Sequence, residues 1–277
     1  MGLRVNQNVS SLNAQRNLGN STGNLQRSLQ RLSSGLRITR AADDAAGLAI
    51  SEGFRADVRS ISQATRNAND GISLLQVGEG ALNEVSGLLI RQRELAIQAA
   101  NGTLGDSERE TINNEFQDLT AEINRISEVT EFNGTSVLGG GGSTTFQIGV
   151  GATENDRVTV QSVDSQASSI GLGSGAGNAT VSTQAAAGSA LASIDNAISN
   201  VASLRASFGT VQNRLESSIR SLAVAQENTA AAESRIRDVD FASETAELTR
   251  NQVLQQAGIS VLAQANVSTQ SALSLLG

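Results

Sequence analysis

The sequence predicts a mainly α-helical protein: a long antiparallel, coiled-coil-like helix bundle with a small β-hairpin insertion and paired N- and C-terminal helices. Three observations predict it. Apolar residues recur at alternating spacings of three and four from Ala187 to Ile236, the pattern of a coiled-coil seam. Residues 45–100 repeat that pattern and supply a partner of similar length. No proline among the 277 residues interrupts either helix.

The N-terminal residues 3–40 predict an amphipathic helix with a break, because their apolar stripe changes phase after Leu12. Residues 41–53 mark a junction before the next helix. We interpret Asp43 and Asp44 as caps of that helix rather than as a catalytic carboxylate pair, because acids are favoured at helix N-termini.

The long helix that follows is expected to end near Ala100, at the turn Asn101-Gly-Thr-Leu-Gly. A third helix then begins at Asp106 or Ser107, and Ser107-x-x-Glu110 matches a capping box. Because the turn is short, we expect this helix to pack antiparallel against the second.

The helical pattern gives way to a β-hairpin in the middle of the chain. Gly139–Gly142 cannot stay helical, and the period-two pattern predicts two strands joined through residues 151–157. Their alternating residues are Phe146, Ile148, Val150, Val158 and Val160. Residues 164–186 are rich in serine, glycine and alanine without a period and predict a surface loop or linker. Residues 237–277 return to an amphipathic helix.

The composition excludes several functions. All 20 basic residues are arginine, and cysteine and histidine are absent. The chain therefore offers no disulfide, thiolate metal site, histidine base or GxxxxGK phosphate loop, and we expect no catalytic residue, cofactor or metal. The net charge of -7 argues against a nucleic-acid partner. No apolar run is long enough for membrane insertion, and we interpret Asp238 and Asp240 as helix-junction charges.

Two kinds of glycosylation site remain open. The Asn-x-Thr triplets at Asn101, Asn133 and Asn178 permit N-linked sugars, and the hydroxyl groups of residues 143–186 are equally available for O-linked sugars.

The two chain ends lack a local partner. One two-stranded seam between them would bury too little apolar surface to offset the conformational entropy lost on ordering both. Our hypothesis is that the ends are frayed in the isolated chain and become ordered against neighbouring copies. The expected subunit-packing residues are Leu25, Leu29, Leu32, Leu36, Leu254, Val261, Leu262 and Leu275.

The sequence resembles bacterial flagellin in a short form with a minimal variable region. At the N-terminal end the resemblance is carried by Asn6-Gln-Asn-Val-Ser-Ser-Leu12, Leu32-Ser-Ser-Gly-Leu-Arg-Ile38 and Ala41-Ala-Asp-Asp-Ala-Ala-Gly-Leu-Ala-Ile-Ser51. At the C-terminal end it is carried by Gly209-Thr-Val-Gln-Asn-Arg-Leu-Glu216 and Ala232-Glu-Ser-Arg-Ile-Arg-Asp-Val-Asp240.

The resemblance implies a structural, non-enzymatic subunit that polymerises into the extracellular flagellar filament for swimming. Residues 1–42 and 237–277 would form the inner-tube domain, 43–138 and 187–236 the helical outer-tube domain, and 139–186 the variable region. It further implies type III export without a cleaved signal peptide. The expected partners are sister copies, a flagellar export chaperone, and the hook-associated junction and cap proteins.

Flagellins are also recognised by a vertebrate Toll-like receptor, and the matching positions are Arg91, Leu95 and Glu115. Arg91 would donate a charge-assisted hydrogen bond, Leu95 would pack and Glu115 would accept. The alternative is that Arg91 and Glu115 are solvated charges on a helix face and Leu95 belongs to the seam.

Two other functions were considered. One is the hook–filament junction protein, which shares the terminal pattern of flagellin. The other is a membrane-active helical protein, which the acidic charge and the absence of lysine disfavour.

Overall fold

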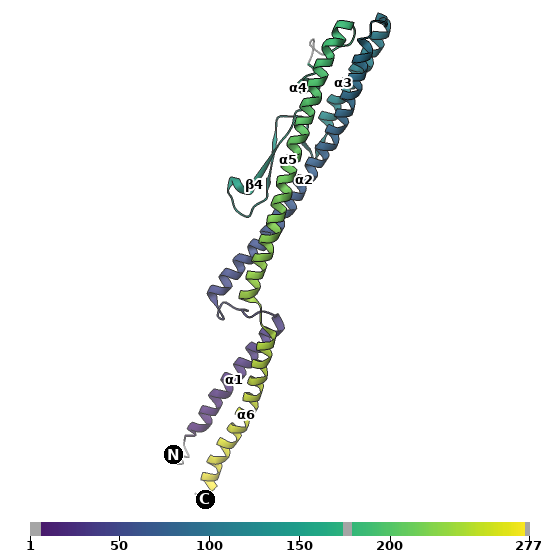
Figure 1. The fold of residues 1–277 in the computed structure, drawn as a ribbon. Coiled ribbons are helices and arrows are strands. Elements are labelled where there is room, and N and C mark those ends of the chain that lie inside the picture. The colour runs from purple at the N-terminus through teal and green to yellow at the C-terminus, as the bar shows by residue number, and fades with distance from the viewer. Residues whose placement is uncertain (1–6, 174–178, 275–277) are drawn as a thin grey trace. The chain divides into compact units, whose positions relative to one another are not determined.

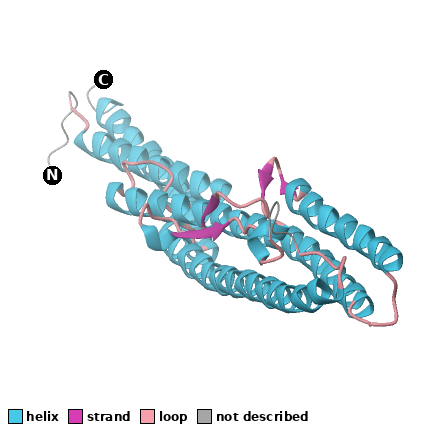
Figure 2. Cartoon of the chain, turned by 90° about the horizontal axis from the view of Figure 1, so that it is seen from above, coloured by secondary structure: helices cyan, strands magenta, loops and turns pink. Residues whose placement is uncertain are grey.

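The computed structural model describes residues 7–173 and 179–274, and the side chains of the last helix as far as 267. Helices dominate the described residues: α1 (Val9–Ser34), α2 (Ala45–Ala99), α3 (Asp106–Val129), α4 (Ala167–Ile170), α5 (Gln184–Arg237) and α6 (Phe241–Ser274). Strands form only two short antiparallel ribbons beside the helices (Figure 2). This confirms the predicted fold class, a mainly helical chain with a small hairpin and paired terminal helices (Figure 1).

The chain divides into two compact units. The terminal unit consists of Met1–Val58 and Glu227–Gly277, and the central unit of Arg59–Gln226. Each is described separately below.

In the central unit α3 and α5 both run antiparallel to α2. Gln92 Nε2 on α2 donates to Thr120 Oγ1 on α3 at 2.8 Å. Further along α2, Ala99 O accepts from Nε of Arg109, which lies earlier on α3. Arg93 pairs with Asp195 on α5 at 2.8 Å, and Glu79 pairs with Arg205 at 3.7 Å. As residue numbers rise along α2, the numbers of the residues it contacts on α3 and on α5 fall, so both helices run antiparallel to α2. The short turn after α2 predicted this direction for α3.

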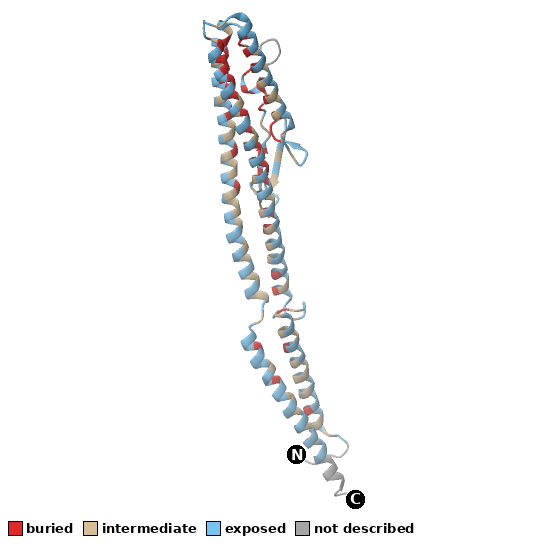
Figure 3. Cartoon of the chain, turned by 90° about the vertical axis from the view of Figure 1, so that its right-hand side faces the viewer, coloured by how far each residue is buried: buried red, intermediate tan, exposed pale blue. Residues whose placement is uncertain are grey.

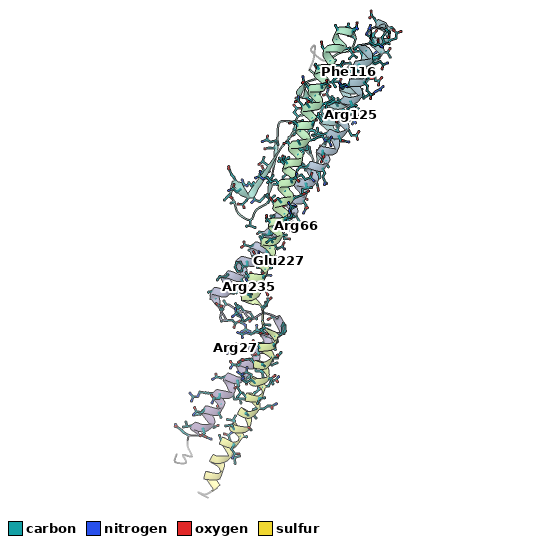
Figure 4. The ribbon with its side chains drawn as sticks, viewed as in Figure 1. Arg27, Arg66, Phe116, Arg125, Glu227 and Arg235 are labelled. Carbon is teal, nitrogen blue, oxygen red and sulfur yellow. The ribbon has the colours of Figure 1, made fainter. Side chains whose placement is uncertain are left out.

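The core of the central unit is a thin seam made mostly of aliphatic side chains. Figure 3 shows where the buried residues lie along its helices. Phe116, labelled on α3 in Figure 4, is fully buried, and aliphatic residues spaced along α2 and α5 are buried with it. They include Leu75, Leu82, Leu89, Ile194, Val201 and Leu215. These positions keep the seven-residue spacing seen in the sequence, so the predicted seam is the observed core.

The first strand of the hairpin ends earlier than predicted. Strand β3 (Ser143–Gln147) pairs with β4 (Arg157–Gln161), so that Phe146 lies opposite Val158. Ile148 and Val150 were expected in the first strand but lie in the connection. The carbonyl of Asp156 accepts from both Ile148 N and Gly149 N, which ends the ladder there. A short 3-10 turn, η1 (Glu154–Asp156), fills the connection.

A second hairpin, not predicted, joins β1 (Glu131–Phe132) to β2 (Thr135–Ser136). Its two-residue turn is Asn133–Gly134, with φ of 51° and 76°. Both residues have positive φ, as a type I′ turn requires, and this explains the asparagine–glycine pair.

The segment 164–186 is more ordered than a linker. Helix α4 lies within it, and Ala167, Ile170 and Leu172 are buried in the core. Asparagine side chains of α3 hold its backbone: Asn124 Oδ1 accepts from Ala167 N at 2.8 Å and Asn113 Oδ1 from Val181 N at 3.0 Å. The segment was expected to be a surface loop or linker. Its described residues instead pack partly into the core, because buried apolar side chains and hydrogen bonds from α3 hold a stretch that has no periodic pattern.

The helix ends correct two further expectations. Helix α1 is shorter than 3–40: Asn8 caps its start, and Gly35 ends it with φ of 71°. The predicted capping box at Ser107 and Glu110 was wrong, since Gly105 is the N-cap of α3 and makes no side-chain cap bond. Arg109 instead caps the end of α2 by donating through Nε to Ala99 O at 3.0 Å.

The close packing of α2 gives a stability prediction. A Cβ atom at Gly78 would lie 2.6 Å from Phe208 Cε2 and 2.8 Å from Val137 Cγ1, and both of these side chains are buried. Gly78→Ala should therefore destabilise the central unit by ~1–3 kcal/mol. Gly80→Ala is the matched control, because its Cβ would meet nothing within 4 Å. It should be stabilising by up to ~1 kcal/mol through helix propensity. Urea unfolding of both variants measures the difference, and equal effects would contradict the account.

Candidate assembly surface

In the terminal unit α1 and α6 lie side by side and antiparallel (Figure 1). Asn8 Nδ2 donates to Ala265 O at 2.9 Å near one end of the pair. Arg31 pairs with Glu244 at 3.5 Å near the other end. The two chain ends therefore have one fixed register, although they are far apart in sequence.

The seam between these helices is narrow and combines polar residues with half-buried leucines such as Leu18. Ala14 and Ser28 are the buried residues of α1, and Glu244 and Asn251 are the buried residues in the described part of α6. At Gly258 a Cβ atom would lie 3.3 Å from Leu18 Cδ1, so the helices approach closely there. The polar groups fix the register of the pair, and the half-buried leucines leave part of their apolar surface uncovered.

Large apolar side chains of the pair instead face outward, about half exposed or more. They are Val9, Leu12 and Leu29 on α1 and Phe241, Val253, Leu254, Ile259, Val261 and Val267 on α6. We call these residues the apolar face. No charged residue follows Arg250 in the sequence, so most of α6 carries no charge that would oppose burial. Large apolar side chains left exposed along one pair of helices favour an interaction site there.

The predicted packing residues lie on or beside this face. Leu29, Leu254 and Val261 are 50%, 49% and 57% exposed. Leu25, Leu32, Leu36 and Leu262 are half-buried. Leu275, like the possible sugar acceptor Asn178, lies outside the described residues. The predicted packing residues did not include Phe241 or Val253, because neither lies on the three-and-four spacing. The absence of charged residues after Arg250 could have indicated that Val253 belongs to this face.

The two connections next to the pair are joined by a short β-bridge, which we call the junction bridge. Arg37 N donates to Arg237 O at 2.7 Å, and Val239 N donates to Gly35 O at 3.0 Å. Arg237 Nη1 also donates to Glu52 Oε1 at 2.7 Å. Local sequence patterns could not indicate this bridge, because its halves are separated by about two hundred residues.

Asp44 and Asp240 act at helix starts, as expected, whereas Asp43 does not cap α2 as predicted. Asp44 Oδ1 accepts from Gly47 N at 2.8 Å at the start of α2, and Asp240 Oδ1 accepts from Ala242 N at 3.0 Å at the start of α6. Asp43 closes the preceding turn: the backbone N–H of Thr39, its hydroxyl and the N–H of Arg40 lower the pKa of Asp43. Within the described ranges, no group of three or more acidic, histidine or cysteine residues could hold a metal ion.

The predicted receptor residues separate into exposed and buried ones. Arg91 bonds Glu115 at 2.9 Å and Glu94 at 2.9 Å, and these hydrogen bonds raise the pKa of Arg91. Arg91 and Glu115 are both about half exposed. Leu95 is only 1% exposed and belongs to the core, so in this conformation its side chain is not available for the direct packing contact expected of it.

The fold and this face define a class of protein: a subunit built from long helices, whose paired N- and C-terminal helices leave apolar surface exposed for contact with other molecules. Among the described residues, no helix is apolar enough over a sufficient length to cross a membrane. The comparisons with known proteins identify the family.

Residues 5–142 match the family model for the bacterial flagellin N-terminal helical region, and residues 191–276 match that for the C-terminal helical region. The chain is 46% identical to a flagellin of Halalkalibacterium halodurans, over 98% of this chain and 99% of that one. It is 41% identical to a flagellin of Bacillus subtilis, over 99% and 100%. The crystal structure of Bacillus cereus flagellin superposes with a TM-score of 0.51 and 32% identity, covering 61% of this chain and 94% of that one.

The chain belongs to the bacterial flagellin family, as the motifs at its two ends indicated. It is a structural subunit that polymerises into the flagellar filament, and the hook–filament junction protein is not favoured by these relatives.

The junction bridge gives a pH prediction. The hydrogen bond and charge of Arg237 hold the pKa of Glu52 below its ordinary 4.5. A lowered folded-state pKa stabilises the fold above the unfolded-state pKa, and this contribution is lost as pH falls through the folded value. Glu52→Gln should therefore lose less stability than the parent chain between pH ~7 and ~3, as urea unfolding followed by circular dichroism would measure.

Glu227→Gln is the control for this experiment, since Glu227 is exposed and forms no ion pair among the described residues. It should follow the pH dependence of the parent chain. The same acid sensitivity in Glu52→Gln and the parent chain would contradict the assignment.

Proposed function

We propose that the apolar face is the main contact between subunits in the filament and that the terminal pair forms its inner tube. Residues 1–42 and 237–277 make up this inner-tube domain. Residues 43–138 and 187–236 form the outer-tube domain, and residues 139–186 form the variable region facing solvent. The observation that carries the proposal is the set of large apolar side chains left exposed on α1 and α6, such as Leu254 and Val261.

These exposed side chains favour sister copies as the occupant of this face. A groove of about 400 Å³ runs beside α1 and α6. Its polar lining residues come from α1 (Asn17, Asn20, Ser21 and Asn24), and its small and aliphatic ones are Ala14, Leu18, Leu254, Ala257, Gly258 and Val261. The small and aliphatic side chains suit the apolar face of another terminal pair, because apolar helix faces associate by interdigitating. The same face accounts for the other expected partners: an export chaperone covering α6 before assembly, and the junction and cap proteins at the filament ends.

The export route follows from the same properties. A subunit with ends frayed before assembly can pass unfolded through a narrow channel. We therefore propose type III export without a cleaved signal peptide and a purely structural, non-catalytic role outside the cell.

Polymerisation tests the apolar face. Leu254→Ser should raise the critical concentration for seeded growth by about tenfold or more, because each buried leucine contributes ~2 kcal/mol. Gln256→Ser changes an exposed polar residue on the same helix and is the matched control. Sedimentation of seeded filaments gives the critical concentration. Normal growth of Leu254→Ser would exclude this face from the subunit contact.

Receptor recognition is a second proposed function, carried by the exposed pair Arg91 and Glu115. The guanidinium of Arg91 and the carboxylate of Glu115 are exposed on α2 and α3. Leu95 is buried in the core and would contribute indirectly, by helping the two helices to pack together. The receptor would replace one of the two carboxylates that now bond Arg91.

Arg91→Ala should weaken Toll-like receptor signalling by about tenfold, the loss expected for one charge-assisted hydrogen bond worth ~1.5 kcal/mol. Arg125→Ala is the control, because Arg125 is an exposed arginine of α3 paired locally with Glu122. A reporter-cell assay on monomers, with filament formation checked in parallel, measures the effect. Equal signalling by both variants would refute the assignment.

A further inference from the structure

The connection between α2 and α3 contains an asparagine–glycine pair, Asn101–Gly102. In such a pair the glycine nitrogen can attack the side-chain amide carbon of asparagine, because glycine has no Cβ to obstruct the approach. Both residues are exposed, so water reaches them. The surrounding structure favours this reaction through two hydrogen bonds.

The first hydrogen bond comes from the backbone of Thr103, whose N–H donates to Asn101 Oδ1 at 3.3 Å. This Asx turn brings the side-chain carbonyl carbon of Asn101 beside the nitrogen of Gly102. Thr103 N–H also points at the oxygen on which negative charge develops when that carbon is attacked. A donor in this position stabilises the tetrahedral intermediate.

The second hydrogen bond comes from Arg109, whose Nη2 donates to the main-chain oxygen of Asn101 at 3.0 Å. That oxygen and the N–H of Gly102 belong to one peptide group. A cation on the oxygen withdraws electrons from the peptide and eases loss of the Gly102 amide proton. The side chain of Arg109 is 8% exposed and is also held by Ala99 O, so the guanidinium is fixed in place.

We propose that Asn101 is a site of spontaneous deamidation whose rate is raised by the fold. The Gly102 nitrogen loses its proton to water and forms a bond to Asn101 Cγ. The Cγ–Nδ2 bond then breaks, and the nitrogen leaves as ammonia after taking up a proton. Water adds to either carbonyl of the resulting succinimide and opens it to aspartate or isoaspartate. The reaction needs no reagent besides water and adds a negative charge at the end of α2.

The chain contains its own control for this proposal. Asn133–Gly134 is followed by threonine, as Asn101–Gly102 is, so the two triplets are identical. Asn133 is also exposed, but it lies in the tight turn between β1 and β2 with φ of 51°. Among the described residues, neither its side chain nor its main-chain oxygen accepts a bond from a cation. Any difference in rate between the two sites must therefore come from the fold.

Hydroxylamine provides the test, because it traps the succinimide and cleaves the chain after the asparagine. The full chain, shown by intact mass to carry no sugar, is incubated with hydroxylamine in native buffer and in urea. In native buffer, cleavage at Asn101 should exceed cleavage at Asn133 by about tenfold or more, the low end for a donor aimed at a developing oxyanion. In urea the two rates should converge. Equal native rates, or the same ratio in urea, would overturn the proposal.

Two variants separate the contributions. Arg109→Gln should slow the reaction at Asn101 and leave Asn133 unchanged, and Arg125→Gln on the same helix should alter neither. An unchanged or faster reaction at Asn101 in Arg109→Gln would overturn the role of the arginine. Gly102→Ala tests the attacking nitrogen directly, since its Cβ would meet only Gln184 Nε2 at an ordinary 3.7 Å. It should nearly abolish cleavage there, and undiminished cleavage would exclude the succinimide route.

Discussion

The apolar surface that α1 and α6 leave exposed is the constraint on which the proposed behaviour of this subunit depends. Glu244 and Asn251 are buried between the two helices, while Leu254 and Val261 are exposed. Burying these exposed side chains would stabilise the pair only when another molecule covers them. We propose that this couples ordering of the chain ends to assembly.

The central unit has the opposite balance. Phe116 and the aliphatic layers of α2, α3 and α5 are buried within a single chain, and the hairpins and the ordered segment around α4 cover part of this seam. Close packing such as that of Gly78 against Phe208 leaves little freedom for rearrangement. We therefore expect the central unit to be stable in a single chain and the terminal unit to gain stability from neighbours.

Much of this could be predicted from the sequence, because the information was periodic and local. The heptad spacing located α2 and α5 nearly to the residue, and Asp44 identified a helix start. The hairpin register and the order around α4 could not be predicted. They depend on hydrogen bonds to main-chain carbonyls and asparagine side chains that lie elsewhere in the sequence, such as the bond that Asn124 Oδ1 accepts from Ala167 N. The junction bridge and the burial of Leu95 depend on tertiary packing, which spacing alone does not specify.

Hydrogen exchange followed by mass spectrometry, on dilute monomer and on filaments of the same chain, tests the coupling most directly. The account predicts fast amide exchange in α1 and α6 of the monomer, slow exchange in the core of α2, α3 and α5, and protection throughout once filaments form. Strong protection of α1 and α6 in the dilute monomer, unchanged on polymerisation, would contradict it.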